Sequence, residues 1–223
     1  YGVVDNDLFQ GASERHAEEL SEPYFLACCR LIESRKNISS LLSAYACYRM
    51  ACPNPWPLVI CGDGEDGDTY RHQAQDLSIA DSVRFRGFLQ AEELADVYAA
   101  AGAFVHPAKE EAWGLVVNEA MAAGLPVLVS EACGCACDLV FEGENGFTFP
   151  PDDILTLAEL LTRISAKPEL DRKSMGERSA EIIRNWAPEK FGEAHLSALM
   201  VAGLAVPDLE KAGAHGAKEL VKC

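Results

Sequence analysis

The sequence has few cations and no long apolar run. Lys and Arg number 19 against 35 Asp and Glu, which gives a formal net charge of −16. This balance argues against nonspecific nucleic-acid binding, which needs a basic surface, and against electrostatic docking on anionic membranes. No apolar stretch is long enough to cross a bilayer, and no signal peptide is visible. The sequence therefore indicates neither a nucleic-acid partner nor membrane association.

The sequence also lacks a paired cysteine framework. Its nine cysteines are an odd number, and most lie in apolar surroundings, which is typical of reduced thiols in a cytosolic protein. Cys133, Cys135 and Cys137 alternate, but zinc sites need C-x2–4-C pairs with further His or Cys partners. We therefore expect a cytoplasmic protein with no metal site and no cofactor.

The remaining composition is that of a soluble globular protein: 223 residues, 49% hydrophobic and 24% charged, enough for one domain and a tail. Apolar runs predict strands at 24–29, 58–61, 83–85, 103–105, 127–129 and 147–149. Helices are predicted between them at 38–50, 69–77, 92–101 and 114–124, and after them at 154–164, 168–183 and 189–201. Alternating strands and helices predict a doubly wound, Rossmann-like α/β fold, with a parallel sheet covered by helices on both faces.

Residues 103–129 organise the chain. A buried strand ends before Pro107, a polar loop follows, Gly114 opens a helix, and Gly124 ends it. Glu111 lies in the loop, and Glu119 lies on the second turn of the helix. Because helical side chains lean toward the helix N-terminus, both carboxylates can border one crevice.

The start of this helix is a predicted anion site. The N–H groups of Gly114, Leu115 and Val116 have no intrahelical partner, and glycine lets an anion approach closely. Carboxylates on either side can accept hydrogen bonds from vicinal hydroxyls. The arrangement suits a ligand with a diphosphate in the middle and a hydroxyl-bearing ring at each end. Either acid taken alone is more readily interpreted as a surface residue.

Two other loops carry candidate residues. Arg30 and Lys36 follow the first strand, where cations can reach a ligand in the crevice, although either could simply pair with an acid. Arg35 is a rival to Lys36. Residues 62–67 match G-x-G-x-x-G, a dinucleotide fingerprint. Three acids and no cation in that loop, and its place after the second strand, make NAD binding the weaker reading.

The run from Glu111 to Val127 resembles the Glu-x7-Glu signature of family 4 retaining glycosyltransferases, which have the GT-B fold and use nucleotide sugars. The Arg30 to Asn37 segment resembles the Arg-Leu-x3-Lys loop of that family, with one extra residue before the lysine. The Gly62 loop resembles the family's Gly-Asp-Gly turn.

The resemblance implies a role for each candidate residue. Arg30 and Lys36 would hold the donor diphosphate together with the amides of residues 114–116, Glu119 would bind the ribose, and Glu111 would bind the sugar. Glu111, Arg30 and Lys36 would thus be the catalytic residues of a metal-independent hexosyltransferase. The nucleotide base would lie against a wall that contains Phe85 and Leu89. The alternative for Phe85 is that it is only a core residue. His106, beside the pocket, is read as structural.

The resemblance also implies a domain plan. Residues 1–23 would be an extended interdomain linker, 24–206 the donor-binding C-terminal half of a GT-B fold including a final crossing helix, and 207–223 a tail. The acceptor would bind to an N-terminal domain absent from this chain, so the chain alone would bind a UDP- or GDP-sugar and turn over little. The alternatives are a non-catalytic nucleotide-sugar-binding module and an NAD-binding domain.

Overall fold

A computed structural model describes residues 4–10, 12 and 22–186. Its strands are β1 (Phe25–Cys28), β2 (Leu58–Cys61), β3 (Val83–Gly87), β4 (Ala103–His106), β5 (Val127–Ser130) and β6 (Gly146–Phe149). They form one parallel sheet in the order β3-β2-β1-β4-β5-β6. The predicted Rossmann-like fold is confirmed, and the order changes direction between β1 and β4, where such sheets bind ligands.

The helices are α1 (Asn6–Gln10), α2 (Glu33–Lys36), α3 (Ile38–Ala51), α4 (Gly67–Asp76), α5 (Ala91–Ala99), α6 (Leu115–Ala122), α7 (Ala136–Leu139), α8 (Ile154–Ser165) and α9 (Glu169–Ile183), followed by the short 3-10 helix η2 (Arg184–Trp186). The predicted helices within the described residues are all present. The helix predicted over 189–201 and the tail 207–223 lie outside them.

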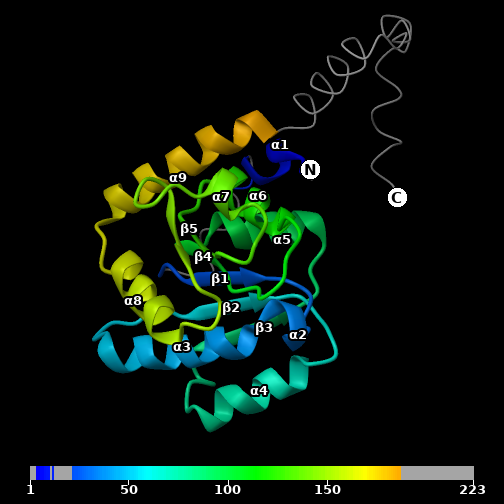
Figure 1. Ribbon diagram of the computed structural model, residues 1–223, viewed down its shortest axis with the longest axis vertical. Helices are drawn as coiled ribbons and strands as arrows, with labels where there is room; N and C mark the ends of the chain where they lie inside the picture. Colours follow the sequence, from blue (N-terminus) through cyan, green and yellow to red (C-terminus); the bar gives the residue numbers. More distant parts are fainter. Residues whose placement is uncertain (1–3, 11, 13–21, 187–223) are drawn as a thin grey trace, which may run out of the picture.

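Successive residues of each central strand belong to opposite faces of the sheet, as the period of two requires. Phe25 and Ala27 belong to a core formed with α3, α4 and α8, whereas Leu26 belongs to a core formed with α1, α5, α6 and α9. Figure 1 shows these two groups of helices on opposite sides of the strands. The central strands are apolar, except for the last residues of β4 and β5, His106 and Ser130, because both of their faces are buried.

One sequence prediction was wrong in this region. We expected residues 1–23 to form an extended linker, but Asn6–Gln10 form helix α1, and Phe9 of this helix is buried in the second core. The linker role of residues 1–23 stays a prediction. The Phe9 ring meets the Tyr98 ring edge to face, with centroids 5.5 Å apart. The Asn6 side-chain amide donates a hydrogen bond to Ile183 O at 3.3 Å. Tertiary contacts therefore stabilise a helix that is too short to form alone.

Two further short helices replace predicted loops. Helix α2 occupies the segment after β1, and α7 occupies the segment after β5. Each has four residues, less than two turns, so neither produces a readable apolar period. Their effect is local: α2 places Lys36 at the edge of the sheet where β1 and β4 end.

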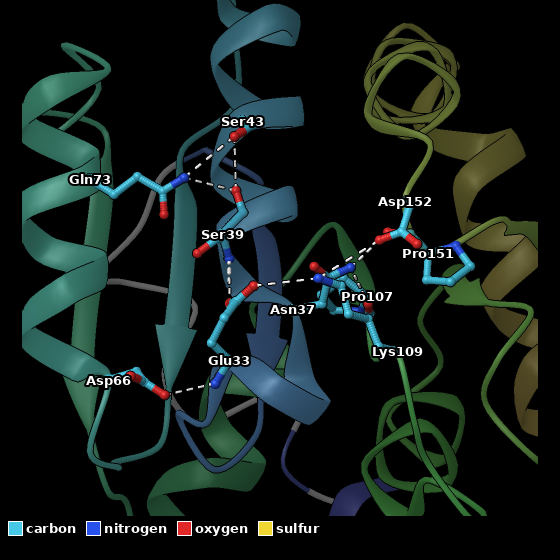
Figure 2. A network of polar contacts seen from close by, with 10 residues as sticks. All are labelled: Glu33, Asn37, Ser39, Ser43, Asp66, Gln73, Pro107, Lys109, Pro151 and Asp152. Atoms are coloured by element: carbon cyan, nitrogen blue, oxygen red, sulfur yellow. Dashed lines mark hydrogen bonds and ion pairs between the residues drawn. The ribbon is translucent and has the colours of Figure 1, made fainter.

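Asn37 joins α2 to α3 and anchors both (Figure 2). It has a left-handed backbone with φ 57° and is fully buried. Its Nδ2 donates to Pro107 O at 3.1 Å and to Pro151 O at 2.7 Å. Asparagine is among the few residues that tolerate this conformation, and here its amide also satisfies carbonyls from two other loops.

Replacing Asn37 with alanine is therefore expected to lower the free energy of unfolding by about 3–5 kcal/mol, from left-handed strain and two unsatisfied carbonyls. Urea denaturation measures this change. Ser78→Ala is the matched control, because Ser78 has φ 56° and is exposed. Equal losses in the two variants would contradict the anchoring role.

Candidate functional site

The candidate site lies along the edge of the sheet where β1, β2, β4 and β5 end, because parallel strands all end at the same edge. The loop after β1 leads into α2, and the loop after β4 leads into α6. Backbone hydrogen bonds join the two: Lys109 N–H and Glu110 N–H donate to Arg35 O, at 2.8 and 3.3 Å. These bonds fix the end of α2 against the loop that carries Glu111.

Lys36, Glu111 and His106 form a charged cluster at this edge. The Lys36 ammonium donates directly to Glu111 Oε2. His106 Nε2 lies 3.7 Å from the same oxygen, an ion-pair distance too long for a hydrogen bond. Arg35, the predicted rival of Lys36, is exposed. Lys36 is thus the residue of this loop whose side chain contacts Glu111.

The cluster changes the titration of its members. His106 first, and Lys36 second, lower the pKa of Glu111 to about 2, against the opposing effect of burial. Burial alone would lower the pKa of His106, but Cys133 and Glu111 outweigh it and the net pKa is raised. His106 is only 1% exposed, and within the described part of the chain its Nε2 has no hydrogen-bond partner. A buried polar atom without a partner is costly, so a ligand hydroxyl would find a ready partner here.

Glu119 has a different environment on α6. Its Oε2 accepts a hydrogen bond of 2.9 Å from the Tyr98 hydroxyl, which also lies 3.3 Å from Val116 O. Burial raises the pKa of Glu119 to about 7, and the Tyr98 hydrogen bond partly offsets this rise. Tyr98 is fully buried, and its ring packs on Phe9 and Phe104. A rigid tyrosine thus fixes the direction of a carboxylate that titrates near neutrality.

Tyr98→Phe is expected to raise the pKa of Glu119 further, because it removes the hydrogen bond that favours the carboxylate. Side-chain carboxyl NMR across pH 4–9 measures the midpoint. Tyr24→Phe is the control: the Tyr24 hydroxyl donates to Val97 O and does not bond to Glu119. A midpoint in Tyr98→Phe that equals the control would refute the assignment.

Gly114 begins the segment between the two acids, with φ 102°. A Cβ there would lie 2.7 Å from Cys133 Sγ and 3.4 Å from Glu111 Cγ. Only glycine therefore fits between the loop after β5 and the start of α6. The first N–H groups of α6, at Leu115 and Val116, have no partner within the helix and carry its positive dipole end.

Gly114→Ala is expected to cost roughly 2–5 kcal/mol of unfolding free energy through left-handed strain and overpacking together. Gly87→Ala is the matched control, since Gly87 has φ 71° and a Cβ there would meet no atom within 4 Å. Thermal unfolding of both variants separates the contact from the strain. The prediction fails if Gly87→Ala is destabilised as much.

A cavity of about 370 Å³ opens beside the start of α6. It is lined by Cys28, Cys29, Arg30, Cys61, Gly62, Asp63, Phe88, Leu89, Leu94 and Val116. Three predicted site residues, Arg30, Leu89 and Val116, therefore meet there. The lining is mostly apolar with one cation at its edge, which suits a flat ring attached to an anionic group.

Phe85 lies elsewhere. Its ring packs with the core on the α3 and α4 face of the sheet, 5.1 Å from the Arg71 guanidinium carbon, and it does not line this cavity. Phe88, three residues later, does line it and is 71% exposed. The structure thus places the predicted aromatic in the core and a neighbouring aromatic at the cavity.

The glycines of the loop after β2 have a packing role. A Cβ at Gly62 would lie 1.8 Å from Cys29 O, and one at Gly64 would lie 2.3 Å from Leu31 O. Leu31 N–H donates to Asp63 O at 2.9 Å. The backbone of the β1 loop therefore fills the space against these glycines, which does not favour the dinucleotide reading.

Sequence reasoning missed the partners of the two acids. His106 was read as structural, and Tyr98 and Cys133 were not proposed as site residues. The position of His106 directly after the predicted strand 103–105 could have identified it as a site residue. No sequence spacing identifies Tyr98. Among the described residues no group of three or more His, Cys, Asp or Glu side chains could hold a metal ion. In the same part of the chain, no helix combines the length and apolarity that crossing a bilayer requires.

Comparison with known proteins places this chain in a family. The sequence model described as "Glycosyl transferases group 1" matches residues 11–181. The chain is 33% identical over 166 residues to the D-inositol 3-phosphate glycosyltransferase of Corynebacterium glutamicum strain R, covering 71% of this chain and 38% of that protein. Across the first three curated relatives, the match covers 15%, 19% and 38% of their length, so the chain spans well under half of each.

Two solved structures show the same architecture. Sucrose-phosphate synthase from Thermosynechococcus elongatus matches with a TM-score of 0.73 and 27% identity, over 90% of this chain and 52% of that one. Anabaena HepE, solved in complex with UDP and glucose, matches with a TM-score of 0.76 and 22% identity, over 90% and 56%. The chain thus belongs to the glycosyl transferases group 1 family and has the Rossmann-like fold of one half of a GT-B glycosyltransferase.

Proposed function

We propose that this chain is the donor-binding, C-terminal half of a metal-independent, retaining hexosyltransferase of family 4, which transfers a sugar from UDP-sugar or GDP-sugar to an acceptor hydroxyl. One observation supports the proposal: Glu111 lies in the loop before α6 and close to Gly114, Glu119 lies on α6, and Arg30 and Val116 line one cavity. Glu111, then the cations and amides, then Glu119 would complement a sugar, a diphosphate and a ribose in that order.

In this proposal each group has one chemical task. The base enters the cavity between Phe88 and Leu89, and the ionised Glu119 accepts hydrogen bonds from the ribose hydroxyls. The amides of Leu115 and Val116, together with Arg30 and Lys36, hold the diphosphate. Negative charge grows on the leaving diphosphate as the sugar bond breaks, so groups already placed there lower the barrier.

Glu111 holds sugar hydroxyls and opposes the positive charge that develops on the sugar ring. The acceptor attacks from the face that the nucleotide leaves, and the donor phosphate takes its proton. The acceptor binds on a further domain of the whole protein, which acts in the cytoplasm. This chain alone therefore binds the donor and transfers little or no sugar.

Isothermal titration of this chain with UDP, GDP, UDP-glucose and GDP-mannose tests the proposal. We expect one nucleotide to bind and its sugar conjugate to compete, with both weakened by Arg30→Ala. Glu159→Gln is the control, because Glu159 is exposed on α8, which packs on the face of the sheet opposite to α6. Absence of binding by all four ligands would overturn the proposal.

The same titration, combined with a sugar-transfer assay of the whole protein, distinguishes the transferase from a non-catalytic binding module. Sugar transfer by the whole protein supports the transferase. Tight donor binding without transfer to any acceptor would favour the module.

A further inference from the structure

The loop after β5 carries two thiols in contact. Cys133 Sγ and Cys135 Sγ lie 3.5 Å apart and are separated in sequence by Gly134 alone. A Cβ at position 134 would lie 2.0 Å from Ala112 O, so the turn between the two thiols needs glycine. Both cysteines are buried, at 3% and 0% exposure. The turn at Gly134 and the loop that carries Glu111 therefore hold the two thiols close together.

The surroundings favour reaction at Cys133. Its Sγ lies 2.9 Å from Trp113 O, which as an acceptor favours the thiol form. Cys135, with the larger effect, and His106 stabilise the Cys133 thiolate, and they lower the pKa of Cys133 despite its burial. Burial instead raises the pKa of Cys28, Cys29 and Cys61, which line the cavity. Among these buried cysteines Cys133 therefore has the greatest thiolate character, and the thiolate is the reactive form.

We infer that Cys133 and Cys135 form a reversible oxidation site, which a hydroperoxide converts to a disulfide that weakens donor binding and a thiol reductant restores. The Cys133 thiolate attacks the peroxide oxygen, the O–O bond breaks, and a sulfenic acid forms as the alcohol or water leaves. Cys135 then attacks that sulfur, and the S–OH bond breaks to release water. The two sulfurs together lose two electrons, which reduce the peroxide.

The disulfide would change the site because its geometry differs from that of the dithiol. An S–S bond is about 2.05 Å long, so at least one side chain must turn inward. If Cys133 turns, it leaves Trp113 O and His106, and His106 lies against Glu111. The backbone is tied in as well: Gly134 N–H donates to Glu111 O at 2.8 Å, and Cys135 N–H donates to Trp113 O at 3.1 Å.

Peptide mass spectrometry tests the oxidation site directly. After hydrogen peroxide treatment of the native chain and blocking of free thiols, we expect a peptide that has lost two hydrogens across Cys133 and Cys135. Dithiothreitol should restore it, and Cys133→Ser and Cys135→Ser should each abolish it. Cys137→Ser is the matched control, since Cys137 is exposed two residues later, in α7. A disulfide to Cys137, or oxidation of Cys133 that yields no disulfide, would overturn the inference.

The effect on binding rests on the proposed function and is measured separately. We expect oxidation to weaken UDP binding by about fivefold or more, within the usual range of coupling between sites. Cys133→Ser, which lacks the thiolate that attacks the peroxide, should bind UDP equally before and after peroxide. An oxidised, cross-linked chain with unchanged UDP affinity would contradict the coupling. Failure of the proposed function is distinguishable, because UDP would then not bind the reduced chain, while the cross-link would still form.

Discussion

Glu119→Gln is expected to weaken binding of UDP-glucose by roughly 10- to 100-fold at pH 8, the loss typical of hydrogen bonds to a charged group. The amide keeps the size of the side chain but removes its charge and one acceptor. The Tyr98 hydroxyl uses one lone pair of Oε2, and the other lone pairs of the carboxylate can accept hydrogen bonds from the ligand. Titration calorimetry of both chains measures the ratio, with Glu159→Gln as the control.

The pH dependence sharpens this prediction. Since the pKa of free Glu119 is raised to about 7, the carboxylate forms as pH rises from 6 to 8, and the affinity of the unaltered chain should rise over this window. The diphosphate diester of UDP-glucose has no group that titrates there. Glu119→Gln should show a flat profile. A parallel rise in both chains would show that Glu119 is not the titrating group.

The stability of the free chain should respond in the opposite sense. A carboxyl whose folded pKa is raised holds its proton more tightly in the folded state than in the unfolded one. Its contribution to stability is therefore present below the unfolded pKa and is lost as pH rises through about 7. The free fold weakens between the unfolded pKa and about 7, and ligand binding strengthens as pH rises through about 7. Both effects should disappear in Glu119→Gln.

Glu111→Gln is expected to lower the rate of sugar transfer by the whole protein about 10²- to 10³-fold, the loss typical of one group that stabilises transition-state charge. With its pKa lowered to about 2, Glu111 is a carboxylate at any working pH. Its charge also neutralises Lys36. The variant therefore leaves Lys36 free to attract the diphosphate, and UDP binding should be retained or become tighter.

Steady-state kinetics separate these two effects, because kcat should fall while the affinity for UDP does not. Glu110→Gln is the matched control, since Glu110 is the exposed neighbour in the same loop. A Glu111→Gln variant with the kcat of Glu110→Gln would show that the Lys36–Glu111 pair is structural only.

The sheet and the α6 segment were predictable because their causes are local. Strands buried on both faces are runs of mainly apolar residues, and Gly114 and Gly124 mark the ends of α6 by their backbone conformations, φ 102° and 75°. The seven residues between Glu111 and Glu119 place one acid in the loop and one on the helix. The structure has Glu119 on the second turn of α6 and Glu111 in the loop before it, as this spacing predicts.

The missed features depend on contacts distant in sequence. Helix α1 exists because Phe9 packs on Tyr98, and its five residues show no periodicity of their own. In β3, alternation shows that Phe85 shares a face with Val83, but not which face of the sheet that is. Nothing in the spacing of His106, Cys133 and Glu111 shows that the end of β4 and the loops after β4 and β5 bring them together.

Amide chemical shifts during a UDP titration of the ¹⁵N-labelled chain test the central claim most directly. The account predicts that the largest shifts occur at Gly114, Leu115 and Val116, with Arg30 and Leu89 next, and that Glu119→Gln reduces them at equal UDP concentration. Shifts confined to the opposite edge of the sheet, or to the loop at Gly62 alone, would contradict a diphosphate held at the start of α6.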